Sequence, residues 1–199
     1  NTFTTSGTSS LSGGTKTLAS RVWNNAGTAT WTGGSINLSD ASATINNLSG
    51  ATFNLQNASV SEDITGPGIF NNAGLVAMNS VAVDTTIFST FNNSGSVTTA
   101  NGILQIFGSG TDTGSYALGA GTVVDFAGGS TRNLNSPASI SGAGLLNTSP
   151  TFGGATVNVN AGSTYSPAST VVSGGTLNFN AATATTGTLT LSAGSVGGS

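Results

Sequence analysis

The chain has 199 residues, a formal net charge of −3, and Gly, Thr, Ser or Asn at more than half of its positions. The absence of His and Cys from the sequence excludes zinc fingers, iron–sulfur centres, imidazole general bases and disulfide frameworks. Three cations, Lys16, Arg21 and Arg132, are too few to neutralise a run of phosphates, so we expect no nucleic-acid partner.

The composition nevertheless predicts a folded, all-β chain. Hydrophobic residues make up 36% of the sequence and charged residues only 5%, whereas disordered chains combine low hydrophobicity with high net charge. Glu, Lys, Arg and Gln, which favour helices, are scarce, while β-branched Thr, Val and Ile are common. No apolar run approaches the ~20 residues of a membrane helix, so we expect no membrane-spanning segment.

An apolar residue followed by two Asn and, shortly afterwards, Gly recurs in the first half of the chain, at 23–27, 45–50, 70–74 and 91–95. The first Asn of each pair lies 22, 25 and 21 residues after the previous one. An Asn side chain both donates and accepts hydrogen bonds, so equivalent Asn residues on stacked coils can form a ladder. We predict such a ladder for one Asn of each pair; the alternative is that Asn-Asn serves only as turn chemistry.

Short apolar–polar–apolar segments follow Gly along the chain, at 34–38, 50–55, 102–106, 121–126, 154–159, 175–179 and 187–191. Alternation with period 2 is typical of half-buried strands. Strands this short suit neither a sandwich nor a parallel α/β sheet. After about residue 96 the Asn-Asn motif ends, and Gly-Gly or Gly-x-Gly corners replace it.

A repeat of 20–25 residues with short strands and no helix predicts a β-solenoid. Each coil would hold two or three strands, and successive coils would stack as parallel ladders about 4.8 Å apart. We expect Leu, Ile, Val, Phe and Ala inside, with Trp23 and Trp31 in the core or on its flank. No linker or charge run divides the sequence, so we predict a single continuous solenoid over residues 1–199.

Two stretches, 91–134 and 173–199, resemble the β-strand repeats of very large bacterial surface proteins, the filamentous-haemagglutinin-like and autotransporter-passenger repeats. The likeness extends over most of residues 22–199. It implies a right-handed parallel β-helix that is exported to the cell surface or the extracellular space and serves as a stalk, adhesin or fibre. The chain departs from haemagglutinin repeats in its uneven coil lengths, and it carries no translocation or secretion domain.

The resemblance also implies partners. We expect the chain to be an excerpt or a subunit of a longer rod, with other copies of itself or flanking repeats stacked end to end. Surface glycans are a further expected partner of such an adhesin.

Six acids are the only candidates for acid–base chemistry: Asp40, Glu62, Asp63, Asp84, Asp112 and Asp125. A glycosidase needs two carboxyl groups that face each other across the scissile bond. Glu62 and Asp63 are adjacent, would point to opposite faces of a strand, and are expected in a solvated loop before Gly66. Asp84 with Asp125, or with Asp112, would have to align on neighbouring coils, an arrangement that the sequence leaves open.

We therefore assign no catalytic, cofactor-binding or metal-binding residue. Calcium-binding repeats, EF-hand loops and P-loops are absent from the sequence. The expected function is a structural or adhesive, non-catalytic β-solenoid segment. The alternative is a carbohydrate-binding or carbohydrate-cleaving β-helix; a cleaving enzyme would need a groove that holds at least two acids and a base.

Overall fold

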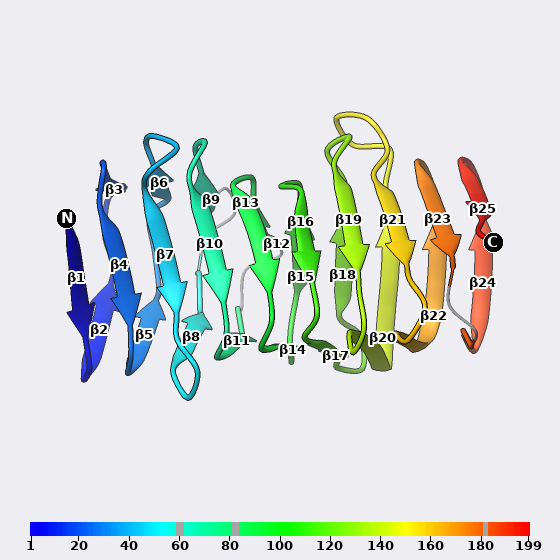
Figure 1. The fold of residues 1–199 in the computed structure, drawn as a ribbon, viewed down its shortest axis with the longest axis horizontal. Helices are drawn as coiled ribbons and strands as arrows, with labels where there is room; N and C mark the ends of the chain where they lie inside the picture. Colours follow the sequence, from blue (N-terminus) through cyan, green and yellow to red (C-terminus); the bar gives the residue numbers. More distant parts are fainter. Residues whose placement is uncertain (59–61, 81–83, 181–182) are drawn as a thin grey trace.

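In the computed structural model, the chain winds into a rod of stacked coils whose termini lie at opposite ends (Figure 1). The structure describes residues 1–58, 62–80, 84–180 and 183–199. Within these ranges every named element is a strand, and neighbouring coils pair in parallel. The predicted all-β, parallel β-solenoid is therefore confirmed.

The first face of the rod is a ten-stranded sheet with one strand from each coil. Its members are, in order, β1 (Thr2–Thr5), β4 (Val22–Asn25), β7 (Thr44–Asn47), β10 (Ile69–Asn72), β13 (Thr90–Asn93), β16 (Gly110–Asp112), β19 (Thr131–Leu134), β21 (Thr156–Val159), β23 (Thr176–Phe179) and β25 (Ser195–Gly197).

Two further faces complete the cross-section. The second face contains β2 (Thr8–Leu11), β5 (Thr28–Trp31), β8 (Thr52–Leu55), β11 (Leu75–Met78), β14 (Ser96–Thr99) and β17 (Ser115–Leu118). The third contains β3 (Lys16–Leu18), β6 (Ile36–Leu38), β9 (Asp63–Thr65), β12 (Asp84–Ile87), β15 (Ile103–Ile106), β18 (Val123–Phe126) and β24 (Thr188–Leu191). The long strands β20 (Ser139–Thr148) and β22 (Thr164–Val172) run around the corner and join these two faces.

Coil length varies while the register of the sheets is kept. Equivalent positions in the first face lie from 19 residues apart, between Asn93 and Asp112, to 25 residues apart, between Asn47 and Asn72. The predicted range of 20–25 residues is thus nearly correct. The differences in length are taken up in the connections between strands.

Alternating burial along each strand builds the core. In β7, Ile45 and Asn47 are buried inside the rod, whereas Thr44 and Asn46 are only partly covered. Trp23 and Trp31 are buried as predicted. A run of aromatic rings follows the inside of the rod, with centroids 5.1–6.2 Å apart: Phe3, Trp23, Phe53, Phe70 and Phe91.

Both Asn of each recurring pair form ladders, which confirms the predicted ladder and extends it. The inner ladder runs from the Nδ2 of each Asn to the Oδ1 of the next, at 2.7–2.8 Å, through Asn25, Asn47, Asn72 and Asn93. The outer ladder has bonds of 2.9 Å and links Asn24, Asn46, Asn71 and Asn92. The inner amides also donate to backbone carbonyls, as Asn72 does to Ser96 O at 3.0 Å. Each corner thus gains side-chain partners for backbone groups that burial would leave unpaired.

Candidate functional site

The acids considered from the sequence are dispersed over the rod. Asp84 pairs with Ile103 in the next coil, and Asp125 pairs with Gln105. Asp112 belongs to a different face and points inward. Asp84 therefore does not align with Asp125 on neighbouring coils, and it does not align with Asp112 either. In the part of the chain that the structure describes, no three acids gather as a metal site requires.

The adjacent acids Glu62 and Asp63 take up separate positions. Asp63 opens strand β9 and is partly buried, so its predicted place in a solvated loop is wrong. Burial raises the pKa of the Asp63 carboxyl above its ordinary value. Glu62 precedes the strand, and its Oε1 accepts a hydrogen bond of 2.8 Å from Gly34 N. The two carboxyl groups therefore face no common cleft.

Three titratable side chains, Asp112, Tyr116 and Arg132, form a buried, hydrogen-bonded cluster inside the rod. Nη2 of Arg132 bonds both carboxylate oxygens of Asp112. The Tyr116 hydroxyl donates to Asp112 Oδ1 at 2.9 Å, and burial raises the pKa of this phenol well above its ordinary value. Nη1 of Arg132 donates to the carbonyl of Phe91 at 2.7 Å.

A glycine makes room for the guanidinium. Gly110 stands in register with Arg132, and a Cβ at Gly110 would lie 2.7 Å from Nη1. A Cβ there would meet the carbonyl oxygen of Phe91 even sooner, so the guanidinium and the carbonyl that it bonds together occupy the space of a side chain at Gly110. The rings of Phe91 and Phe126 lie with their centroids 5.7 and 5.5 Å from its Cζ, within cation–π range.

This cluster fixes how neighbouring coils align and is not accessible to a substrate. Asp112, Tyr116 and Arg132 have no solvent exposure, so a substrate cannot contact them. The carboxylate and the guanidinium neutralise each other, and the ring faces shield them from water. A buried charge pair of this kind fixes one register between neighbouring coils, because a shift of either strand would leave a charge without its partner.

The sequence reasoning missed this cluster, although the coil repeat carried a signal for it. Asp112 follows Asn93 by one coil and takes the next inward position after the inner Asn ladder. The backbone N–H of Asn93 donates a hydrogen bond of 3.2 Å to Asp112 Oδ1. A repeat-based alignment of coils would have placed this acid on the inside, but it carries no such signal for Arg132, which stands in register with a glycine.

A row of polar side chains lies on the outside of the third face. Thr86 Oγ1 donates to Gln105 Oε1 at 3.2 Å, and Asn147 Nδ2 donates to Asp125 Oδ1 at 3.0 Å. Gln105 and Asp125 are in register and hydrogen-bonded to each other. Burial raises the pKa of the Asp125 carboxyl despite these bonds.

We expect Asp125→Asn to make the rod more stable at pH 7 and to reduce its loss of stability between pH 4 and pH 7. Because the folded-state pKa is raised, the folded chain holds this proton more tightly than the unfolded chain does. The stabilisation is complete below the ordinary Asp pKa of about 4 and is lost as the pH rises through the folded-state pKa. Urea unfolding of both proteins at pH 4 and pH 7 measures the difference.

Asp40→Asn serves as a control of opposite sign. Hydrogen bonds from Ser42, and further ones from Ser20, lower the pKa of Asp40 to about 2. Its stabilisation is present above the ordinary Asp pKa and is lost as the pH falls toward 2. The Asn variant at position 40 should therefore be weakened at pH 7. Equal pH profiles for the two variants would contradict both assignments.

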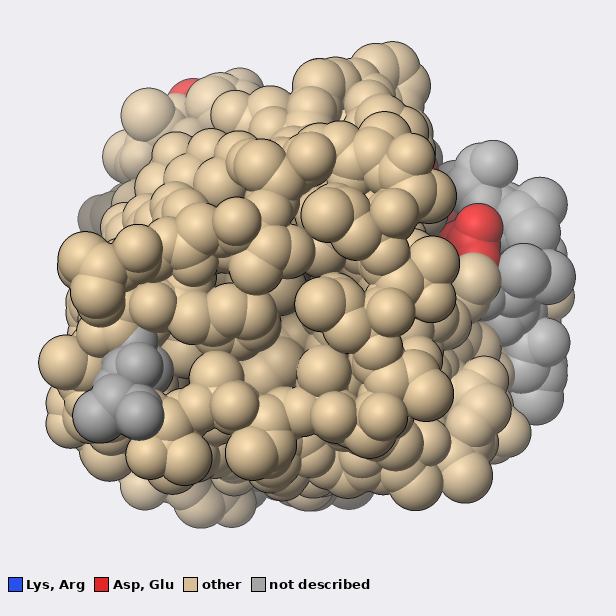
Figure 2. All heavy atoms as spheres, turned by 90° about the vertical axis from the view of Figure 1, so that its right-hand side faces the viewer, with Lys and Arg blue, Asp and Glu red and all other residues tan. Residues whose placement is uncertain are grey.

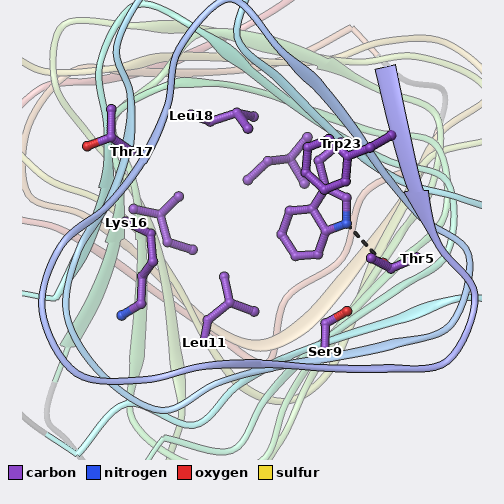
Figure 3. Close-up of a pocket in the computed structure, with 10 residues that line it drawn as sticks. Thr5, Ser9, Leu11, Lys16, Thr17, Leu18 and Trp23 are labelled. Atoms are coloured by element: carbon purple, nitrogen blue, oxygen red, sulfur yellow. Dashed lines mark hydrogen bonds between the residues drawn. The ribbon is translucent and has the colours of Figure 1, made fainter. Parts of the chain in front are cut away.

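An apolar hollow of about 270 Å³ opens at the first coil (Figure 3). Its lining includes Phe3, Leu11, Leu18 and Trp23, and the Trp23 indole donates to Thr5 Oγ1 at 2.9 Å. Lys16 also lines it, but its ammonium bonds the carbonyl of Gly34 at 3.2 Å. The hollow is the interior of the rod where the first coil has no coil before it in the structure.

The opposite end also presents side chains from the core columns. Leu189 and Leu191 continue columns whose previous members, Thr170 and Val172, are fully buried, yet they are 52% and 53% exposed. Figure 2 looks onto this end and shows no atom of Lys or Arg and acidic atoms only near its margins. The exposed Leu189 and Leu191 therefore give this end an apolar middle, while the hollow at the first end is apolar except for Lys16 and a few polar side chains.

No protein-family model, curated protein or solved structure matches this chain. Among the described residues, no helix is present that is long and apolar enough to cross a bilayer. The site must accordingly be interpreted from its own geometry.

Proposed function

We propose that this chain is a non-catalytic, structural and adhesive segment of an exported bacterial surface protein or extracellular fibre. The coils associate end to end, with other copies of the chain or with flanking repeats. The proposed location, outside the cell or on its surface, extends the resemblance of the sequence to bacterial surface repeats.

The observation that carries the proposal is that the core columns run through the rod and are exposed at its ends. Phe3 is 45% exposed in the first coil, and Leu189, Leu191 and Val196 are 37–53% exposed in the last. End strands also present unpaired backbone donors and acceptors. Another coil placed on either end would bury these side chains and continue the parallel ladders. The separation of the acids described above supports a role without catalysis.

The test is end-to-end assembly. We expect sedimentation to show assemblies whose mass increases as the protein concentration rises. Micrographs of the native material should show filaments. The double variant Leu189→Lys/Leu191→Lys places charges in the exposed core columns and should abolish this growth.

Thr190→Lys is the matched control. Thr190 lies on the same strand, in register with the outward-facing Val171, so its charge points away from the columns. This variant should assemble as the natural chain does. A chain that stays monomeric at every concentration, with compact isolated particles in the native material, would contradict the proposal.

A further inference from the structure

We propose that the corner formed by Phe88, Phe107, Gly128 and Phe152 binds a neutral pyranose ring of a glycan. The proposal deepens the adhesive role proposed above, because it names what the rod would adhere to. It concerns the side of the rod rather than its ends.

Three Phe rings gather on the outside of this corner, which lies between the third and first faces. The Phe88 and Phe107 rings stack with centroids 4.9 Å apart and planes 24° apart. The Phe107 and Phe152 rings meet at 66° with centroids 5.8 Å apart. Phe88 and Phe152 are 42% and 79% exposed. Phe107, which contacts both, is only 8% exposed, so the Phe88 and Phe152 rings are the two apolar walls that face solvent.

A glycine keeps the space between these walls open. Gly128 lies in the coil between those of Phe107 and Phe152, and a Cβ there would lie 2.7 Å from the Phe107 ring. The hollow lined by these four residues has a volume of about 320 Å³. That volume is at the lower end of the range for small-molecule sites. Three rings alone offer far less area than the ~800 Å² per partner of a stable protein interface.

The backbone at Phe152 is an independent sign of function. Gly153 N donates to Pro150 O at 3.0 Å, so residues 150–153 form a turn, and Phe152 occupies its third position with φ of 56°. A positive φ at that position normally requires Gly. The local backbone thus holds a bulky residue in an unfavourable conformation and leaves its ring in water. The strained backbone costs stability, and such strain is typical of functional positions.

The polar side chains beside the Phe rings favour a sugar as the ligand. Phe88 and Phe107 lie two residues beyond Thr86 and Gln105, so on an alternating strand they share the outer face with the polar row that continues to Asp125. A pyranose has an apolar face that can lie against a Phe ring and hydroxyl edges that can reach this row. The formal charges in the row are carboxylates, Asp125 and, in register with Thr86, Asp63, and they disfavour anionic sugars.

Titration of the ¹⁵N-labelled chain with cellohexaose, maltohexaose and chitohexaose tests the proposal. We expect at least one of them to shift the amide signals of Gly128 and Gly153, and a galacturonate oligomer to bind more weakly. Phe152→Gly should weaken binding about tenfold, since it removes one stacking wall. The same variant should unfold at an equal or higher urea concentration, because Gly relieves the positive φ.

Ser20→Gly is the matched control, because Ser20 also has a positive φ, of 50°, but carries no ring and lies far from the corner. It should leave binding unchanged. The proposal is overturned if none of the neutral oligosaccharides shifts the corner signals at millimolar concentration, or if the galacturonate oligomer binds best. It is also overturned if Phe152→Gly destabilises the fold, or if the corner signals respond only to protein concentration, as in contact between copies. Binding is measured on the Leu189→Lys/Leu191→Lys background, so failure of end-to-end assembly does not affect the result.

Discussion

Arg132→Met is expected to lower the free energy of unfolding by about 3–5 kcal/mol, which would be among the largest effects of any single substitution in this chain. The substitution leaves the carboxylate of Asp112 buried beside Phe rings without its counter-charge. It also removes the donor that satisfies the carbonyl of Phe91. Urea unfolding at pH 7, followed by circular dichroism, measures the loss.

The triple variant Asp112→Leu/Tyr116→Phe/Arg132→Met tests the cause. It removes the charges and the phenol together, so no buried charge remains without a partner, and more than half of the lost stability should return. Arg21→Met is the surface control and should change the stability by less than about 0.5 kcal/mol, since Arg21 is exposed. If the triple variant were as unstable as Arg132→Met, the loss would come from packing and not from charge.

Asn72→Ala is expected to lower the free energy of unfolding by about 2–3 kcal/mol. Asn72 is buried in the middle of the inner ladder, accepts a bond from Asn47 and donates to Asn93 and to the carbonyl of Ser96. Removing its amide leaves the Asn93 Oδ1 atom without this donor and opens a cavity in the core.

Asn71→Ala is the adjacent control for this substitution. Asn71 makes equivalent ladder bonds, to Asn46 and Asn92, on the outer side of the same strand. Water can replace these partners there, so we expect a loss of less than about 1 kcal/mol. Equal losses for the two variants, measured by the same urea unfolding, would show that burial does not set the value of the ladder.

The architecture could be predicted from the sequence because the repeat itself carries the information. The spacing of the Asn pairs gives the coil length, and their bonding capacity gives the ladder. Trp31 lies between Thr30 and Thr32, and Trp23 begins the Trp-Asn-Asn motif, so their burial also follows from the local pattern. These features depend on residues near one another in sequence or one coil apart.

The buried cluster and the aromatic corner could not be predicted in the same way. Charged residues are mostly exposed, so general rules place Arg132 on the surface. Its burial depends on Gly110 in the previous coil and on a carbonyl two coils back. The corner depends on Phe152 having a positive φ, although two Gly follow it in the sequence and would be the expected positions for that conformation.

The long-range contact of Arg132 affects how the rod unfolds. Most side-chain bonds in the rod join adjacent coils, whereas Arg132 contacts a carbonyl 41 residues away and thereby ties three coils together. In a repeat array that is held by nearest-neighbour contacts, unravelling starts at the termini and proceeds inward. The guanidinium holds together three coils near the middle of the rod, since β13, β16 and β19 are the fifth to seventh strands of the ten-stranded first face. Amide hydrogen exchange should accordingly slow from each terminus toward β13, β16 and β19, so that fraying from one side stops before it reaches the other.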